Sequence, residues 1–271
     1  MRTVFGVFGD PIAHSKSPDM HNAAFRELNM ECTYHAFRVK PENLKNALLG
    51  AKAMGFGGVN LTVPLKQEAL KIVDADPLAE GIGAVNTVDF KDGMKGYNTD
   101  GLGAKRTLEE KDVEIKGSNA LIVGAGGASR AIAFQFAKEG ANINIANRTE
   151  SKAVNLASEV SAVGNATGCG LEDIKKVIAD SDILINCTTL GMHPNTDGTI
   201  ATAEDMHPEL TVFDIVYNPL ETRLLKEAKK AGAKAVTGEM MLIYQGAEAF
   251  RIWTGVEPPI DVMKKAVLEG L

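Results

Sequence analysis

Apolar segments of strand length alternate with amphipathic segments of helix length along the first part of the chain. The strand-like segments are residues 3–8, 33–38 and 58–62, and helical patterns over 18–29 and 41–54 separate them. Strands that alternate with helices are typical of α/β folds, in which most strands run parallel. We therefore expect this part of the chain to form an α/β unit with a largely parallel sheet.

A second alternation follows a charged helical pattern over residues 101–112. Its strand-like segments are residues 120–123, 143–146, 183–186, 212–216 and 234–237. Behind them, residues 239–253 and 260–268 have the pattern of two helices, and no strand follows. Helices in that place can return to the first unit and cover part of its sheet.

The length of the chain supports two domains, because 271 residues is about twice the length of an average domain. We predict an α/β domain of residues 1–100, which is completed by the C-terminal helices of residues 238–271 packing back on it. Residues 101–237 are predicted to form a doubly wound, Rossmann-type domain.

The composition is that of an ordinary globular protein, with 45% hydrophobic and 24% charged residues. The formal net charge of −6 has the wrong sign for a surface that attracts nucleic acid, so no nucleic-acid partner is expected. No apolar run is long enough for a signal-peptide core or a membrane span. We therefore expect a cytoplasmic protein without a membrane partner.

Several kinds of chemistry lack their residues here. The three cysteines, Cys32, Cys169 and Cys187, are widely spaced and odd in number, which argues against a disulfide framework or a Cys-x-x-Cys motif. The five histidines show no metal-binding spacing, and no Gly-x-Ser-x-Gly elbow occurs. The sequence therefore predicts neither a metal centre nor an acyl-serine enzyme.

A glycine-rich loop lies between a predicted strand and a predicted helix in the second half. It reads Gly124-Ala-Gly-Gly-Ala128, with Ser129 where a third glycine is common. Gly124 permits a tight turn, and Gly126 lets backbone N–H groups approach a pyrophosphate at the positive end of the helix. A dinucleotide site is one interpretation, and a glycine-rich turn without a ligand is the other.

The segment after the next strand favours NADP over NAD. An NAD-binding unit places an acidic residue there for the ribose 2′-hydroxyl, whereas this chain has Asn147, Arg148, Thr149 and Lys152. Arg148 and Lys152 can bind a 2′-phosphate, and Asn147 does not repel it. The alternative is that both cations are ordinary surface charges.

Two serines precede the first predicted helix. Pro18 suits the first helical position, and Ser17 is then an expected N-cap. Capping does not explain Ser15. Two hydroxyl groups beside a helix N-terminus can hold a carboxylate, so we interpret this pair as a binding site for an acidic substrate.

Lys66 and Asp100 are the candidates for proton transfer. The sequence predicts a helix that begins near Pro64, which puts Lys66 in its first turn, where the helix dipole disfavours a cation. Asp100 lies directly before the next helical pattern and is either its N-cap or a partner for Lys66 across a cleft. Paired, the two groups would form an acid–base couple.

Nine short motifs together resemble the shikimate dehydrogenase family nearly from end to end. They are Ser15-Lys-Ser-Pro-x-x-His-Asn22, Asn60-x-Thr-x-Pro-x-Lys66, Gly83-Ala-Val-Asn-Thr87, Tyr97-Asn-Thr-Asp100, Gly124-Ala-Gly-Gly-Ala128, Asn147-Arg-Thr149, Asn186-x-Thr-x-x-Gly-Met192, Asp214-x-x-Tyr-Asn-Pro219 and Gly238-x-x-Met-Leu-x-x-Gln-Gly246. Leu61, where the family often has valine, is a minor departure.

The resemblance implies an oxidoreductase that reversibly reduces 3-dehydroshikimate to shikimate with NADPH, in the route to chorismate and the aromatic amino acids. It implies that Lys66 exchanges a proton with the C3 oxygen while Asp100 orients it. Ser15 and Ser17 would hold the carboxylate. The residues implied to bind ring hydroxyls or to close the site are Asn60, Thr62, Asn86, Asp100, Gln245 and Tyr217.

The resemblance also implies which residues contact NADP. They are Gly124, Ala125, Gly126, Gly127, Ala128, Asn147, Arg148, Thr149, Lys152, Thr188, Met192, Ile215, Gly238 and Met240. From the sequence alone, Met192 and Met240 can equally be core residues, and Tyr217 and Gln245 can serve locally. The roles of His14 and His21 remain open.

Two alternatives to this function remain at this point. One is a quinate/shikimate dehydrogenase that uses NAD. The other is a regulator that senses shikimate or NADP without turning it over, although the presence of both Lys66 and Asp100 argues against it. The sequence does not distinguish a monomer from a homodimer.

Overall fold

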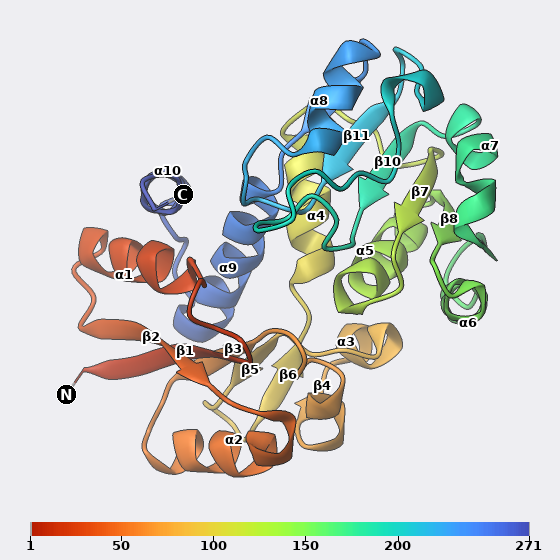
Figure 1. Ribbon diagram of the computed structural model, residues 1–271. Coiled ribbons are helices and arrows are strands. Elements are labelled where there is room, and N and C mark those ends of the chain that lie inside the picture. Colours follow the sequence, from red (N-terminus) through yellow and green to blue (C-terminus); the bar gives the residue numbers. More distant parts are fainter. Residues whose placement is uncertain (1, 271) are drawn as a thin grey trace. The chain divides into compact units, whose positions relative to one another are not determined.

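The computed structural model describes residues 2–270, and the chain forms two compact units (Figure 1). Unit 1 consists of the described residues up to Gly103 together with Leu242–Gly270, and unit 2 consists of Ala104–Met241. The chain passes from one unit to the other within two helices, α4 (Asp100–Glu109) and α9 (Glu239–Thr254). Met1 and Leu271, the outer ends of the predicted first domain, lie outside the described residues.

Unit 1 is built on a six-stranded sheet with the order β2-β1-β3-β5-β6-β4. Its strands are β1 (Thr3–Gly9), β2 (Cys32–Arg38), β3 (Gly58–Leu61), β4 (Asp74–Ala75), β5 (Thr87–Asp89) and β6 (Lys95–Tyr97). The strands β1, β2 and β3 are parallel, but β5 is antiparallel to both β3 and β6. The sheet is therefore mixed, but β4 is parallel to β6, and both run in the direction of β1, β2 and β3. The expectation of a largely parallel sheet is confirmed except for β5, which is reversed.

The reason for the antiparallel pair is the short connection between β5 and β6. A parallel pair needs a crossover of a dozen or more residues, whereas a tight turn can join only antiparallel strands. The segment from Phe90 to Met94 is such a turn. The sequence pattern missed β4, β5 and β6 because strands of two or three residues carry too few positions for an alternation to show.

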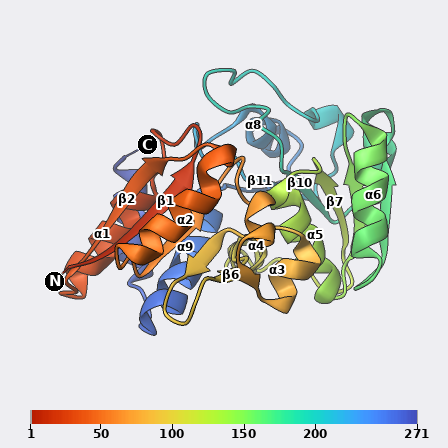
Figure 2. The same cartoon turned by 90° about the horizontal axis from the view of Figure 1, so that it is seen from below.

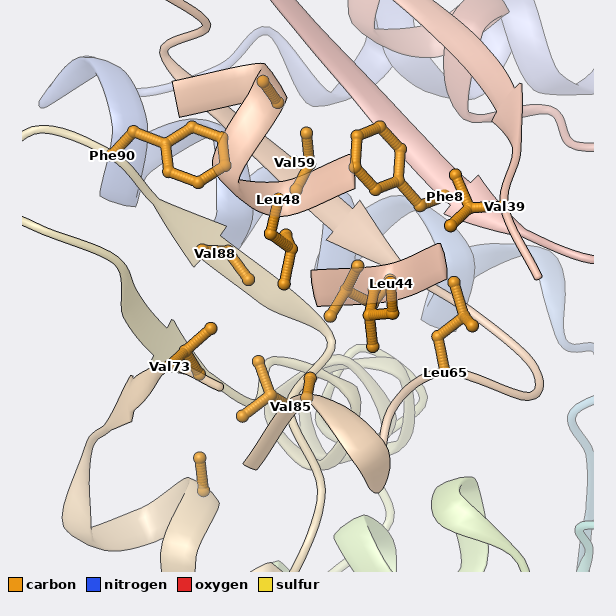
Figure 3. Packing of buried hydrophobic residues seen from close by; sticks show 14 residues of the cluster. Phe8, Val39, Leu44, Leu48, Val59, Leu65, Val73, Val85, Val88 and Phe90 are labelled. Atoms are coloured by element: carbon orange, nitrogen blue, oxygen red, sulfur yellow. The ribbon is translucent and has the colours of Figure 1, made fainter. Parts of the chain in front are cut away.

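Helices cover both faces of the unit 1 sheet. They are α1 (Ser17–Glu27), α2 (Leu44–Ala53), α3 (Pro77–Ile82), α10 (Ile260–Leu268) and the part of α9 that belongs to this unit, with short 3-10 helices at Pro41–Asn43 and Glu68–Lys71. Figure 2, viewed from the side that α2 covers, shows this helix in front of the sheet. Figure 3 shows Leu44 and Leu48 of α2 packed against Val59 and Val88 of the sheet.

An aromatic cluster fills the opposite face of the sheet. Phe5 of β1 stacks on Trp253 of α9 at a centroid distance of 5.1 Å, and Phe25 of α1 lies 5.1 Å from Phe250. The indole N–H of Trp253 donates to the Val88 carbonyl oxygen at 3.1 Å, so this buried donor has a hydrogen-bond partner. The predicted return of the C-terminal helices to the first unit is confirmed.

Unit 2 contains a six-stranded sheet with every strand parallel, in the order β12-β11-β10-β7-β8-β9. The strands are β7 (Asn119–Val123), β8 (Asn142–Ala146), β9 (Ala166–Cys169), β10 (Ile183–Asn186), β11 (Thr211–Asp214) and β12 (Lys234–Val236). This order reverses between β7 and β10, as in the doubly wound Rossmann fold. The predicted fold class of this part is confirmed.

The helices of unit 2 lie on both faces of its sheet (Figure 1). They are α5 (Gly127–Lys138), α6 (Glu150–Val160), α7 (Ile174–Ala179), α8 (Arg223–Lys230) and the part of α4 in this unit, with 3-10 helices at Leu171–Asp173 and Ala203–Asp205. Apolar side chains of α7 and α8, among them Ile178 and Leu225, share one core with Leu121, Leu184 and Val212 of the strands.

Two local expectations about helix starts were wrong. Ser17 is the first residue of α1 rather than its N-cap; Lys16 takes that place without a side-chain cap, and the Ser15 hydroxyl accepts a hydrogen bond from the Ser17 N–H at 3.3 Å. No α-helix begins at Pro64. Residues 63–67 form turns and a bend, so the dipole argument for Lys66 does not apply.

None of the helices in the described part of the chain combines the length and the apolar character that crossing a membrane requires.

His21 generates a prediction about stability. Its side chain is fully buried, its ring stacks on Tyr34 at a centroid distance of 4.3 Å, and neither ring nitrogen has a hydrogen-bond partner among the described residues. Burial lowers the pKa of His21 to about 3. The unfolded chain therefore binds a proton that the folded chain rejects as the pH falls below 6.5.

Above pH 6.5, His21 is neutral in both the folded and the unfolded chain. As the pH falls from 6.5 toward 3, only the unfolded chain gains the proton, so the free energy of unfolding decreases by about 1.4 kcal/mol per pH unit. We expect the His21→Leu variant to lack this part of the acid dependence. Urea unfolding of both proteins between pH 4 and pH 7 measures it. Equal pH slopes would mean that His21 is not the group responsible.

Candidate functional site

The predicted substrate residues of unit 1 meet at one edge of its sheet. The strands β1, β3 and β6 run in the same direction, and their carboxyl ends lie beside the amino end of the antiparallel strand β5. Ser15 follows β1, Lys66 follows β3, Asp100 follows β6 and Asn86 directly precedes β5. Segments far apart in the sequence therefore bring their polar side chains to the same edge.

Lys66 and Asp100 form an ion pair at this edge. The Lys66 Nζ donates to Asp100 Oδ2 at 2.5 Å, and the side chains are 17% and 7% exposed. The lysine loop is anchored as well, because the Lys66 carbonyl oxygen accepts a hydrogen bond from the Val85 N–H at 2.8 Å. Of the two places that the sequence left open for Asp100, the structure shows the partnership with Lys66.

Asn86 holds the other oxygen of the aspartate. Its Nδ2 donates to Asp100 Oδ1 at 2.8 Å and to Thr99 Oγ1 at 3.0 Å, while its Oδ1 accepts from the Thr99 N–H and the Thr87 hydroxyl, both at 2.9 Å. The Asn86 side chain is almost fully buried. Its amide therefore orients Asp100 from inside the protein.

Thr87 and Thr99 are members of this network that the sequence analysis did not single out. Both are buried, and both lie inside motifs that carried the family resemblance. Nothing in their local sequence marks either threonine as functional, so only their shared contact with Asn86 Oδ1 shows that they belong to the network.

Gln245 reaches the same network from α9. Its Nε2 donates to the Leu242 carbonyl oxygen at 2.8 Å, which is the local backbone contact that the sequence left open. Its Oε1 lies 3.4 Å from Asn86 Nδ2, at the long end of hydrogen bonding. Gln245 is half-buried, so part of its amide faces the same edge of the sheet.

Asn60 lies on β3 next to the ion pair and is buried. Its Nδ2 donates to the Asn86 carbonyl oxygen at 3.1 Å and to Thr87 Oγ1 at 3.0 Å, and its Oδ1 accepts from the Tyr34 hydroxyl at 2.7 Å. Both amide hydrogens are thus used within the protein. One lone pair of Oδ1 is left for a ligand, so Asn60 can accept a hydrogen bond but has none to donate.

The remaining substrate candidates are placed less uniformly. Ser17 is buried, whereas Ser15 and Thr62 are half-buried. Tyr217 belongs to unit 2, where it follows β11, and burial raises the pKa of its hydroxyl. It is therefore not part of the cluster that unit 1 assembles.

The predicted cofactor residues gather at the carboxyl edge of the unit 2 sheet. They follow five of its parallel strands: the glycine loop after β7, Asn147–Lys152 after β8, Thr188 and Met192 after β10, Ile215 after β11, and Gly238 and Met240 after β12. In open α/β sheets this edge, near the point where the strand order reverses, is where ligands bind.

The glycine loop has the form that a phosphate requires. Gly124 has φ 119°, and a Cβ there would lie 3.0 Å from Ser129 Oγ and 3.1 Å from the Cys187 carbonyl oxygen. A side chain would therefore be strained and crowded. Gly126, the N-cap of α5, is exposed, has nothing within 4 Å of a Cβ position and provides no side-chain cap. The first N–H groups of α5 can bind an anion there.

Arg148 and Lys152 fit a second phosphate. Both are exposed, and among residues 2–270 neither forms an ion pair with an acidic side chain. They flank the start of α6, whose N-cap Thr149 makes no side-chain cap either. Asn147 donates to the Thr149 carbonyl oxygen at 3.0 Å, which fixes the turn. These residues fit the 2′-phosphate of NADP.

Asp214 ties together the loops after β10 and β11. It is fully buried and accepts hydrogen bonds from Asn186 Nδ2 at 2.9 Å, the Thr222 hydroxyl at 2.6 Å and the Val216 N–H at 3.1 Å. Asn186 Oδ1 in turn accepts from the Thr188 hydroxyl at 2.7 Å. The network sets the course of both loops, although the sequence analysis used Asp214 only as a motif residue.

The last strand brings Gly238 against the neighbouring loop. A Cβ on Gly238 would lie 2.5 Å from the Ile215 carbonyl oxygen, so the close approach requires glycine. The two methionines differ: Met240 is buried, as the core interpretation expected, whereas Met192 is 43% exposed. A core role is therefore wrong for Met192.

Three family models match this chain. Residues 7–88 match the shikimate dehydrogenase substrate binding domain, residues 104–221 match shikimate/quinate 5-dehydrogenase, and residues 238–268 match the shikimate 5′-dehydrogenase C-terminal domain. The chain belongs to the shikimate dehydrogenase family. The resemblance seen in the sequence motifs is confirmed.

Proteins that are named shikimate dehydrogenase align with this chain over nearly its whole length. The shikimate dehydrogenase (NADP(+)) of Methanosarcina barkeri is 65% identical over 100% of this chain and 99% of its own length. A crystal structure of a shikimate dehydrogenase in complex with NADP+ is 49% identical, with a TM-score of 0.93, and covers 99% of this chain and 95% of that chain. The Thermus thermophilus enzyme in complex with NADP(H) and shikimate is 39% identical, with a TM-score of 0.91, over 99% and 100% of the two chains.

Two histidines near the serine motif, His14 and His21, lie in different surroundings. His14 is exposed, and His21 is enclosed by the aromatic cluster of unit 1. Within residues 2–270 no group of three His, Cys, Asp or Glu side chains is arranged to hold a metal ion.

The buried Asp214 generates a prediction about pH. Burial raises its pKa from 3.8 to about 6, against the opposing effect of hydrogen bonds from Thr222, Val216 and Asn186. The folded chain therefore holds this proton more tightly than the unfolded chain. As the pH rises from about 4 to about 6, the unfolded chain ionises this carboxyl group while the folded chain keeps its proton, so the free energy of unfolding falls by about 3 kcal/mol in total.

We expect the Asp214→Asn variant, which is neutral at every pH, to lack this decrease. The difference in unfolding free energy between the variant and the unaltered chain should change in favour of the variant between pH 4 and pH 6.5 and stay constant above that range. Chemical unfolding at a series of pH values measures it. A difference that does not change with pH would show that Asp214 carries the same charge in both states.

Proposed function

We propose that this chain interconverts 3-dehydroshikimate and shikimate with Lys66 as the proton donor and acceptor and Asp100 as its orienting partner. NADP-dependent shikimate dehydrogenation is the activity of the family, and the cofactor is NADP. The ion pair between Lys66 Nζ and Asp100 Oδ2, at 2.5 Å, is the observation that carries the assignment of roles.

Proton transfer needs a group that is fixed beside the reacting oxygen. Asp100 restrains the Lys66 ammonium, and Asn86 restrains Asp100 from the other side, at 2.8 Å. In reduction, Lys66 donates a proton to the C3 oxygen as it becomes a hydroxyl group; in oxidation, Lys66 accepts that proton. NADPH supplies the hydride when it is bound.

The substrate is held by groups of matching chemistry. Ser15 and Ser17 lie at the start of α1, where hydroxyl groups and the helix N-terminus favour the substrate carboxylate. Asn60 offers its remaining lone pair, and Thr62, Asn86, Asp100 and Gln245 complete the contacts to the ring hydroxyls. Tyr217, a residue of unit 2, is proposed to help to close the site. Residues 1–100 with 238–271 thus form the substrate domain of this proposal.

NADP is assigned to residues 101–237 together with the start of α9. The pyrophosphate belongs at Gly124, Ala125, Gly126, Gly127 and Ala128, and the 2′-phosphate belongs at Asn147, Arg148, Thr149 and Lys152. Thr188, Met192, Ile215, Gly238 and Met240 are assigned to the nicotinamide end. The support for this is the open N-terminus of α5 and the unpaired cations at the start of α6.

The nearest alternative is a dehydrogenase that accepts quinate and NAD, and one matching family model covers both acids. Arg148 and Lys152 argue against NAD, because an NAD site has an acidic residue for the free ribose hydroxyl. A sensor without catalytic activity is disfavoured by the intact pair of Lys66 and Asp100.

The cytoplasmic location predicted from the sequence is part of this proposal, since NADPH is a reductant of the cytoplasm. The choice between monomer and homodimer stays a prediction for solution measurements.

The first test replaces the proposed proton donor. We expect Lys66→Ala to lower kcat for shikimate oxidation by a factor of about 10²–10⁴, the usual contribution of a general acid or base, with a much smaller effect on KM. The matched control is Lys71→Ala, since Lys71 is an exposed lysine whose ion pair, among the described residues, is with Glu68. If kcat survives the loss of Lys66, another group transfers the proton.

The second test concerns the choice of cofactor. Arg148→Ala should raise KM for NADP by about 10- to 100-fold, the value of a hydrogen bond between charged groups, and should leave KM for NAD unchanged. Steady-state assays with both cofactors, and with shikimate and quinate, measure this. Arg26→Ala, at an exposed arginine of α1, is the control. Equal losses with NADP and NAD would show that Arg148 does not contact the 2′-phosphate.

A further inference from the structure

A buried tyrosine that neither the motifs nor the comparisons assign contacts two of the proposed substrate residues. We propose that Tyr34 is a positioning residue, whose hydroxyl group orients the Asn60 amide toward the substrate and couples it to Ser17. This inference rests on the proposed function of Asn60 and Ser17. Tyr34 itself is fully enclosed and does not touch the substrate.

Two contacts together set which way the Asn60 amide faces. Tyr34 Oη donates to Asn60 Oδ1 at 2.7 Å, whereas the Asn60 Nδ2 faces the Asn86 carbonyl oxygen at 3.1 Å, which can only accept. A rotated amide would place oxygen against the Asn86 carbonyl oxygen, which has no hydrogen to donate, so this carbonyl excludes the rotated form. In the form that remains, Tyr34 supplies the donor for Oδ1. The tyrosine hydroxyl thereby keeps the Oδ1, with its remaining lone pair, in a fixed place.

The same hydroxyl also reaches the serine side of the site. Burial raises the pKa of Tyr34, and a hydrogen bond with the Ser17 side chain opposes that rise. Tyr34 therefore lies between Ser17, proposed to bind the carboxylate, and Asn60, proposed to bind a ring hydroxyl.

Tyr34 can serve as a fixed point because its own position is held from three directions. Asn22 donates to the Tyr34 carbonyl oxygen at 2.8 Å and accepts from its N–H at 2.9 Å. The His21 ring stacks on the tyrosine ring, at 4.3 Å and 10°. The strand β2 is bound to β1 along its length, with Tyr34 opposite Phe5.

The His-Asn pair of the first motif thus has a role that the sequence did not suggest. Neither histidine nitrogen has a hydrogen-bond partner among the described residues, so His21 contributes through packing, while Asn22 contributes two hydrogen bonds. Together they fix Tyr34 against β2, and through it the Asn60 amide on β3.

The test is a double-mutant cycle with Tyr34→Phe, Asn60→Ala and the double variant. Tyr34→Phe removes one oxygen and leaves a buried acceptor without its donor, for which we expect about a tenfold loss of kcat/KM for shikimate. The loss should come through KM, with KM for NADP unchanged within about twofold. Because Tyr34 acts through Asn60, the same change in the Asn60→Ala background should have less than about a threefold effect.

A matched control separates positioning from a general loss of stability. Ser118→Ala also removes a buried hydroxyl group, one that donates to the Ile115 carbonyl oxygen at 2.8 Å in unit 2. It should lower the melting temperature about as much as Tyr34→Phe and leave kcat/KM for shikimate unchanged. Thermal unfolding of all variants shows that the kinetics refer to folded protein.

Calorimetric titration of shikimate into the same proteins keeps this test independent of turnover. Failure of the unaltered chain to oxidise shikimate would contradict the proposed function. The double-mutant cycle tests only whether Tyr34 positions Asn60. Unchanged shikimate affinity in Tyr34→Phe, or losses from the two single variants that simply add in the double variant, would overturn the positioning role.

Discussion

The polar site of unit 1 depends on the hydrogen bonds that satisfy one buried carboxylate. Asp100 has a nearly enclosed side chain, and each of its oxygens has its own donor, Lys66 on one side and Asn86 on the other. A carboxylate in such surroundings is expensive to leave unpaired. The need to satisfy it therefore fixes the lysine amine in place and aligns the Asn86 amide, which in turn orders Thr87 and Thr99.

The polar network and the apolar packing of unit 1 are separate but joined at a few residues. The aromatic cluster on the α1 and α9 side of the sheet packs ring against ring, and it encloses His21, whose ring nitrogens have no hydrogen-bond partner among the described residues. Tyr34 belongs to both, because its ring stacks within the cluster and its hydroxyl group enters the network. Such a residue transmits the rigidity of the core to the orientation of a polar side chain.

Both units place their chemistry at the ends of strands, for the same reason. Side chains in the middle of a buried strand pack against helices, whereas the residues just after a strand are free of that packing yet close to fixed backbone. In unit 1 this edge collects hydroxyl, amide and charged groups. In unit 2 it collects open backbone N–H groups and cations, with Asp214 fixing two neighbouring loops.

Some of these features were determined by the sequence alone. The alternation of strands and helices indicated two α/β units, and Asn147, where an NAD site has an acidic residue, indicated NADP together with Arg148. Each of these is a local property of a short segment. The tertiary structure decided the rest. Whether Asp100 caps a helix or binds Lys66, whether Asn60 has a hydrogen bond to give, and whether Met192 is buried depend on which distant segments become neighbours. The spacing of residues in the sequence does not show which segments become neighbours. The packing of the sheet brings residues 34, 60, 86 and 100 together, and their hydrogen bonds to one another limit what each can bind.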